Sequence, residues 1–88
     1  FVYLGPNSSV GTGSLLNTSS SIHHDAKLGE FVEIAPGARI LGSAKIGNQC
    51  LIGTNSVIFP NVSIGDNCKI GAGVVVKKDI PADSIITS

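Results

Sequence analysis

Aliphatic side chains recur at every sixth position over most of this 88-residue chain, and this period constrains the fold more than any other feature. From the fourth residue onward, thirteen consecutive positions of the series hold Leu, Ile or Val. They are Leu4, Val10, Leu16, Ile22, Leu28, Ile34, Ile40, Ile46, Ile52, Ile58, Ile64, Ile70 and Val76. A period of six is neither that of an amphipathic helix nor the simple alternation of a half-buried strand. The chain is therefore built from short internal repeats.

Two further positions of the repeat carry residues suited to a tight corner. A small or compact residue follows four positions after each aliphatic residue, at Ser8, Ser14, Ser20, Ala26, Val32, Ala38, Ala44, Cys50, Ser56, Val62, Cys68, Val74 and Ile80. Gly, Asn or Asp recurs three positions after it, at Asn7, Gly13, Asp25, Gly37, Asn55, Asn61, Asn67, Gly73 and Asp79. These three residue types tolerate a left-handed backbone. Each repeat thus predicts a short strand with its aliphatic and small residues inward, followed by a corner.

Three such repeats close a triangular coil of 18 residues, and the coils stack at the strand spacing of roughly 4.8 Å. Stacking creates one continuous apolar column, which stabilises a domain too small for a large compact core. A six-residue repeat leaves no room for the crossover helix of ordinary right-handed parallel structure. We therefore predict an all-β fold, a left-handed parallel β-helix of about four to five coils, with residues 1–88 as one domain. The alternative, an antiparallel sandwich, has strands of varying length and turn spacing.

Composition argues against several classes of protein. The formal net charge is zero and 14% of residues are charged, which argues against a nucleic-acid partner. No apolar run is long enough to cross a membrane and no signal peptide is recognisable, so we expect a cytoplasmic protein. The sequence contains no Met, and we expect it to be a piece of a longer protein, truncated at both ends.

His24 is the strongest candidate for catalysis. It precedes Asp25 at an outward corner, and the only other histidine is its neighbour His23. Because residues 18 apart stack, we expect His24 to lie between Pro6 and Gly42. A neutral imidazole accepts protons near pH 7, and a carboxylate orients it and favours the imidazolium. A backbone N–H at the glycine would bind an oxyanion.

The same map places Thr54 and Ala72 in one corner column. It also places Cys50 and Cys68 one coil apart at inward positions, where a disulfide is geometrically conceivable. Two reduced thiols that pack as small apolar side chains are favoured, because nothing in the sequence indicates secretion.

A longer motif resembles one family of enzymes. It runs from Asn17-Thr18 to His24-Asp25 and continues through Leu-Gly-Glu-Phe-Val-Glu-Ile-Ala-Pro-Gly at 28–37. It resembles the sugar O- and N-acyltransferases of the sialic acid O-acetyltransferase and bacillosamine N-acetyltransferase branch. That branch shows Asn-Thr, His-Asp or His-Glu, Ile-Gly-Asp-Phe and His-Ile-Ala-Pro-Gly. Residues 70–81 resemble its closing coil, so the resemblance covers essentially the whole chain.

The resemblance implies an acetyl-CoA-dependent acetyltransferase that acts on the amine or hydroxyl of a sugar or nucleotide-sugar. It also implies a homotrimer with acetyl-CoA in a cleft between neighbouring helices. In this interpretation His24 is the general base, Asp25 raises its basicity, and the N–H of Gly42 faces the thioester oxygen. Thr54 and Ala72 fall where the family's backbone holds the pantetheine arm.

The chain departs from the family in three places. Glu33, at a position expected to contact CoA, stands where the family commonly has His. We expect this piece to lack the family's N-terminal nucleotide-sugar domain, since no strand-GxGxxG-helix pattern occurs in it. We also expect it to lack the Gly-Asn-Pro-Ala-type segment that the family carries after the position of Ile86. Lys77 and Lys78 remain candidates for contact with the CoA phosphates.

Two other functions compete with this interpretation. A metal enzyme of the γ-carbonic anhydrase type shares the fold but needs three His ligands, and two adjacent histidines predict no metal site. A non-catalytic module that only trimerises is the stronger alternative, and affinity for acetyl-CoA separates it from an enzyme. Cyclic symmetry and the open ends of the coil stack also favour a trimer.

Overall fold

The structure, a computed structural model, describes all 88 residues and consists of fourteen two-residue strands joined by corners. The strands are β1 (Tyr3–Leu4), β2 (Ser9–Val10), β3 (Leu15–Leu16), β4 (Ser21–Ile22), β5 (Lys27–Leu28), β6 (Glu33–Ile34), β7 (Arg39–Ile40), β8 (Lys45–Ile46), β9 (Leu51–Ile52), β10 (Val57–Ile58), β11 (Ser63–Ile64), β12 (Lys69–Ile70), β13 (Val75–Val76) and β14 (Ile85–Ile86). No helix is present that could cross a bilayer.

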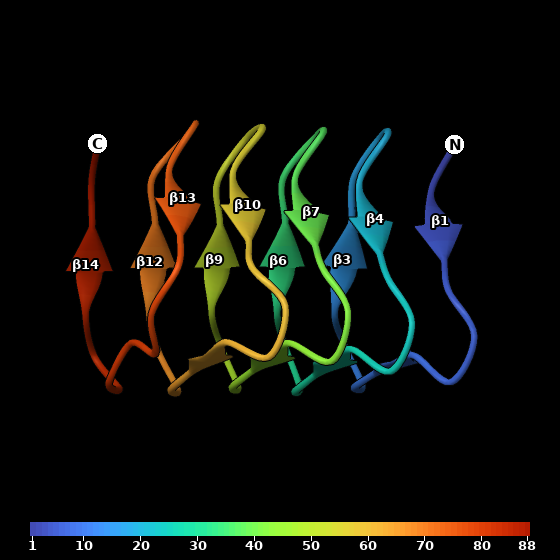
Figure 1. Cartoon of the computed structure of the whole chain (residues 1–88), viewed down its shortest axis with the longest axis horizontal. Helices are drawn as coiled ribbons and strands as arrows, with labels where there is room; N and C mark the ends of the chain where they lie inside the picture. Colours follow the sequence, from blue (N-terminus) through green and yellow to red (C-terminus); the bar gives the residue numbers. More distant parts are fainter.

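The strands form three parallel sheets, one on each side of a triangular prism. Sheet A has the order β1-β4-β7-β10-β13, sheet B the order β2-β5-β8-β11, and sheet C the order β3-β6-β9-β12-β14. In Figure 1 the chain descends in sheet A, runs along the bottom through sheet B toward the back, and rises in sheet C as it moves from the N-terminal to the C-terminal end. This is the left-handed sense. The predicted left-handed parallel β-helix, with about five coils, is confirmed.

Strand pairing confirms the predicted 18-residue coil. In sheet A, Ile22 pairs with Ile40, and Ile40 pairs with Ile58. The same offset holds in sheets B and C as far as β11 and β12. Residues at equivalent corners therefore stack directly on the outside of the prism.

The inward residues form one buried cluster along the axis of the prism. Of the thirteen periodic aliphatic residues, the ten from Ile22 to Val76 are buried. Leu4 and Val10 are exposed and Leu16 is half-buried. These three residues lie in the first coil, and no other coil covers its outer side. The periodic pattern fixes which side chains point inward, whereas burial also needs a coil on either side.

The position of a residue within the repeat, more than its type, determines whether its backbone is left-handed at the corner. The third residue after each aliphatic has positive φ at all twelve corners from Asn7 to Gly73. The predicted Gly, Asn and Asp positions follow this rule up to Gly73, and Phe31 adopts the same conformation with φ of 55°. A bulky side chain is uncommon there and is sterically disfavoured.

The last coil is shorter than predicted. Ile80 bridges Ile64, and Asp79 contacts Ser63, at an offset of 16 residues instead of 18. Ile80 thus occupies the aliphatic position rather than the small one, and Asp79 lacks the left-handed conformation expected of it. The shortened corner brings β14 back into register with β12 at Ile70.

Candidate active site

The corner between sheets A and B carries His24. The N–H of Ser43 donates to the carbonyl of His24 at 2.9 Å, and the N–H of Asn61 donates to that of Gly42 at 3.0 Å. These bonds stack the corners of successive coils directly, as the 18-residue map predicts. His24 therefore lies in one column with Pro6 and Gly42.

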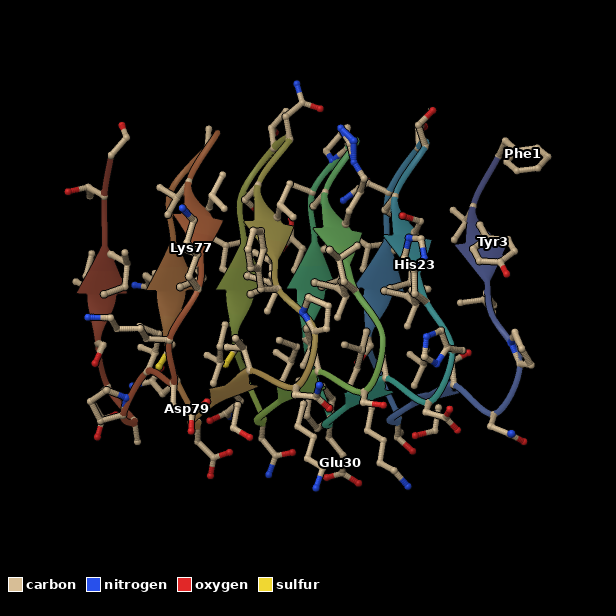
Figure 2. All side chains as sticks on the ribbon, viewed as in Figure 1. Phe1, Tyr3, His23, Glu30, Lys77 and Asp79 are labelled. Carbon is tan, nitrogen blue, oxygen red and sulfur yellow. The ribbon has the colours of Figure 1, made fainter.

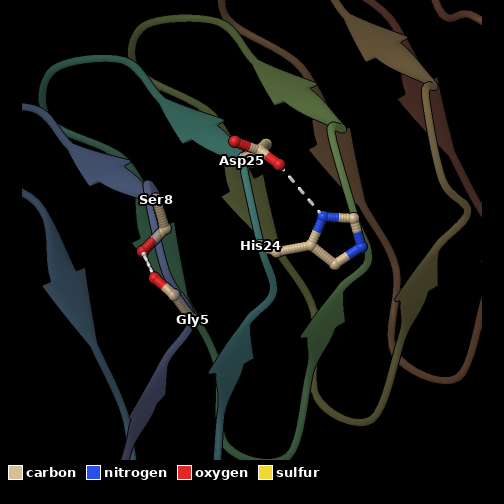
Figure 3. A network of polar contacts seen from close by, with 4 residues as sticks. All are labelled: Gly5, Ser8, His24 and Asp25. Atoms are coloured by element: carbon tan, nitrogen blue, oxygen red, sulfur yellow. Dashed lines mark hydrogen bonds and ion pairs between the residues drawn. The ribbon is translucent and has the colours of Figure 1, made fainter.

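The imidazole of His24 is held by the residue that follows it. Its Nδ1 lies 3.2 Å from Oδ2 of Asp25, in the only ion pair of the chain (Figure 3). The positive φ of Asp25, 61°, belongs to the sharp corner that brings the two side chains together. When Nδ1 carries the proton and donates to the carboxylate, the lone pair of Nε2 is free to accept one. The side chains are 64% and 52% exposed, so they are accessible to a substrate.

Gly42 forms the surface beneath the imidazole. A Cβ on this glycine would lie only 2.6 Å from Cε1 of His24 and 3.1 Å from Cδ2. Its φ is not in the left-handed region, so the close approach of the ring, rather than backbone conformation, requires glycine here. The N–H of Gly42 donates to no acceptor within the chain.

The unpaired amide follows from the geometry of the corner. Amides two positions after the aliphatic residue lack a backbone acceptor, which explains why Pro36 and Pro60 are tolerated there. At the corner between sheets B and C, side chains supply the acceptor: the N–H of Asn48 donates to Oδ1 of Asp66 at 2.7 Å. No such side chain serves Gly42, so its N–H has no partner within the chain, and the residue is buried beneath the imidazole.

The other predicted cofactor-binding residues lie away from His24. Thr54 and Ala72 stack at the corner between sheets C and A, where the N–H of Gly73 donates to the carbonyl of Thr54 at 2.8 Å. Both are exposed, and Glu33 is exposed on β6 of sheet C. The full width of sheet A separates the Thr54 corner from the His24 corner, and the single chain has no pocket. One chain thus unites His24, Asp25 and Gly42 only.

Sequence reasoning missed a contact beside the site. The ring of His23 lies with Nε2 3.1 Å from the hydroxyl of Ser21, and it packs edge-on to Tyr3 with ring centroids 5.7 Å apart. Tyr3 and His23 are labelled on sheet A in Figure 2. Residues two apart in a strand share a face, so the sequence could have predicted the contact between Ser21 and His23. Lys77, also labelled, lies 5.8 Å from the ring centroid of Phe59.

The two cysteines are free and buried. Sγ of Cys50 donates to the carbonyl of Gly65 at 3.1 Å, and Sγ of Cys68 donates to that of Pro81 at 3.1 Å. Burial raises the pKa of Cys50 above the ordinary thiol value. No group of three His, Cys, Asp or Glu side chains gathers as metal ligands would.

Part of the chain matches a known protein family. Residues 43–78 match the family model described as bacterial transferase hexapeptide (six repeats). The match covers fewer than half of the residues, and the left-handed β-helix extends the same six-residue repeat over the rest of the chain. No curated protein matches it.

The chain is also similar to several solved acetyltransferase structures. The acetyltransferase domain of PglB from Neisseria gonorrhoeae, in complex with acetyl coenzyme A, is 28% identical with a TM-score of 0.88, covering 99% of this chain and 51% of that one. A variant of perosamine N-acetyltransferase from Caulobacter crescentus, in complex with CoA and GDP-perosamine, is 25% identical with a TM-score of 0.87, covering 99% and 47%. Neisseria gonorrhoeae serine acetyltransferase (CysE) is 37% identical with a TM-score of 0.85, covering 91% and 34%.

The first two of these neighbours match the sugar acyltransferase branch that the motif resembles. The present chain spans about half the length of the first two.

Proposed function

We propose that residues 1–88 form the acyl-transferring domain of an acetyl-CoA-dependent acetyltransferase that modifies the amine or hydroxyl of a sugar or nucleotide-sugar. One observation carries the proposal: His24 pairs through Nδ1 with Asp25 while its ring rests on Gly42, whose N–H is unpaired. Two structurally similar proteins are seen with acetyl coenzyme A, or with CoA and a nucleotide-sugar. Because acetyl-CoA is an intracellular metabolite, we place the protein in the cytoplasm.

The chemistry follows from the three groups. Nε2 of His24 removes a proton from the acceptor as its nitrogen or oxygen attacks the thioester carbonyl, which forms the new C–N or C–O bond. The oxyanion of the tetrahedral intermediate accepts the N–H of Gly42. Collapse breaks the C–S bond, and the imidazolium returns the proton to the CoA thiolate. Transfer is direct, because both cysteines are buried and no thiol nucleophile reaches the surface.

A second copy of the chain completes the site in this proposal. Sheet A carries exposed apolar side chains at Tyr3, Phe59 and Val75, and it joins the His24 corner to the corner that holds Thr54 and Ala72. Packing of copies through this face would bring the Thr54–Ala72 column of one chain toward the His24 corner of the next. Cyclic closure then gives a homotrimer with one acetyl-CoA in each cleft. Sedimentation of a monomer at working concentration would contradict the shared cleft.

The two neighbouring histidines provide a matched test. His24→Ala should lower kcat for acetyl transfer by roughly 10²–10⁴-fold, the contribution of a positioned general base. His23→Ala should stay within a few-fold of the unmodified protein, because its ring contacts Ser21 and not the proposed reaction centre. Release of the CoA thiol, with free and nucleotide-linked amino sugars as acceptors, measures both. Undiminished turnover of His24→Ala would exclude this mechanism.

The single chain has no pocket, an observation that also fits a non-catalytic module whose role is to trimerise. Isothermal titration with acetyl-CoA separates the two functions. The enzyme binds the thioester, whereas a structural module shows no affinity for it.

A further inference from the structure

Arg39 is the only arginine in the chain and the only charged residue within the strands of sheet A. It lies on β7, between Ser21 on β4 and Val57 on β10. Its side chain is exposed and forms no ion pair, because the single ion pair of the chain joins His24 to Asp25. The guanidinium keeps its positive charge at any physiological pH. Its own chain thus leaves this cation without a carboxylate partner.

Sheet A is also the face through which copies of the chain pack in the proposed function. That face presents exposed apolar side chains at Tyr3, Phe59 and Val75, and none of its strands contains a carboxylate. A guanidinium enclosed in such a contact without a counter-charge is strongly destabilising. Arginine is nevertheless enriched at protein interfaces, because its planar fork pairs well with carboxylates. Packing through sheet A therefore requires a carboxylate from the neighbouring copy near Arg39.

Only two of the six carboxylate side chains border sheet A, namely Asp25 and Asp79 at the corner between sheets A and B. The other four lie on sheet C or at the corner between sheets B and C: Glu30, Glu33, Asp66 and Asp83. Asp79 already accepts the N–H of Ser63 at 2.8 Å. Asp25 uses one oxygen only, since Oδ2 faces Nδ1 of His24 while Oδ1 has no hydrogen-bond partner (Figure 3). Asp25 is thus the carboxylate with a free oxygen.

Arg39 and Asp25 lie at opposite edges of sheet A within one chain. Arg39 begins β7, directly after the corner between sheets C and A, whereas Asp25 lies at the corner between sheets A and B. The proposed shared cleft brings the Thr54 corner of one copy toward the His24 corner of the next. The same packing brings Arg39 of the first copy toward Asp25 of the second.

The heights of the two groups along the prism also match. In a cyclic trimer whose axis runs along the prisms, equivalent residues of all copies stand at the same height. Asp25 precedes Arg39 by less than one coil, so their heights differ by roughly 4 Å at the usual strand spacing. Asp79 lies more than two coils beyond Arg39, roughly 10 Å along the axis. A long arginine side chain spans the smaller difference, which favours Asp25.

We propose that Arg39 of one copy binds Asp25 of the next and so positions the pair formed by His24 and Asp25. The contact rests on the proposed acetyltransferase function and its shared cleft. The guanidinium donates to Oδ1 of Asp25 and holds the carboxylate against the imidazole. Nδ1 of His24 then keeps its proton, and Nε2 faces the acceptor. Arg39 touches neither the substrates nor the reacting atoms, so it is a positioning residue, and the site is complete only in the assembled trimer.

The titration of the His24 ring, followed by NMR, tests the contact without turnover. A guanidinium beside the pair disfavours the imidazolium and offsets the negative charge of Asp25. Arg39→Gln should therefore raise the midpoint of the His24 titration by about half a pH unit, the effect through water of one charge about 7 Å from the ring. Arg39→Lys, which keeps the charge, should leave the midpoint nearly in place. Lys69→Gln, which removes an exposed cation from sheet C, is the control and should not move it. An unmoved midpoint in Arg39→Gln would overturn the proposal.

Mixed trimers show whether Arg39 acts across copies. Arg39→Gln alone should lower kcat by roughly 10–100-fold, the usual cost of losing a group that orients a reacting side chain, with KM for acetyl-CoA nearly unchanged. His24→Ala supplies an intact Arg39 but no base. In every mixed trimer of these two variants, one site joins an intact His24 to an intact Arg39. Mixed trimers should therefore regain about a third of the kcat of the unmodified trimer. Activity no greater than that of the Arg39→Gln copies alone would contradict a contact between copies.

Together the two measurements distinguish failure of the contact from failure of the proposed function. A raised His24 midpoint in Arg39→Gln, in a protein without acetyl transfer, would support the contact and count against the acetyltransferase function. Full activity of Arg39→Gln beside an inactive His24→Ala would support the acetyltransferase and overturn the role of Arg39. Sedimentation of each variant as a trimer excludes loss of assembly as the cause of either result.

Discussion

Replacement of Gly42 by alanine isolates the positioning of His24 from every other feature of the fold. The added Cβ would lie 2.6 Å from Cε1 of the imidazole and closer still to Nε2, whereas ordinary contact begins at 3.4 Å, so the ring must move by about 1 Å or rotate away. The ring is largely exposed and can do so without disturbing the core. A displacement of about 1 Å at a catalytic group costs on the order of 10²-fold in rate. We therefore expect Gly42→Ala to lower kcat about 100-fold with little loss of stability.

Thiol release at saturating acetyl-CoA measures this loss, and thermal unfolding of the same sample measures stability. The backbone of Gly42 is not left-handed, so alanine introduces no φ strain that would confound the comparison. NMR of the His24 ring should show a change in environment in the variant, while the His23 ring should be unaffected. Full activity of Gly42→Ala would refute the argument that the glycine exists to seat the imidazole.

The remaining predictions concern the core. Ile40→Ala, at a fully buried position in the middle of sheet A, should lower the free energy of unfolding by about 2–5 kcal/mol in urea titrations, whereas its exposed neighbour Arg39→Ala should leave it nearly unchanged; equal stability of the two variants would contradict the inward column. Burial raises the pKa of Cys50, so the folded state keeps the thiol protonated where the unfolded chain ionises it, and stability should fall as the pH rises above the ordinary thiol value of 9.0. Cys50→Ala should reduce that alkaline loss, as measured by urea titrations from pH 8 to 10; an identical pH dependence in both proteins would refute this origin.

The sequence period was sufficient to predict the fold and the column map, because every inward position of a solenoid repeats the same packing requirement. The 18-residue map alone brings Gly42 over His24 beside Asp25, and the structure confirms this arrangement. The six-residue period does not show why position 42 requires glycine. The reason is the contact with the imidazole ring of His24, which depends on a side-chain rotamer that the period does not determine.

Local geometry escaped prediction where the repeat itself changes. The final coil loses two residues, which moves Ile80 into an aliphatic position that simple counting assigned to a small residue. Phe31 takes a left-handed corner that its residue type disfavours, because the neighbouring coils dictate the backbone there. In both cases stacking against an adjacent coil outweighs the local preference of the chain.

A crystal structure of the protein with acetyl-CoA tests the central claim most directly. We expect the thioester oxygen within hydrogen-bonding distance of the N–H of Gly42, Nε2 of His24 facing the carbonyl carbon, and the pantetheine arm along Thr54 and Ala72 of a neighbouring copy. Acetyl-CoA bound with its thioester remote from the imidazole of His24 would contradict the proposed active site.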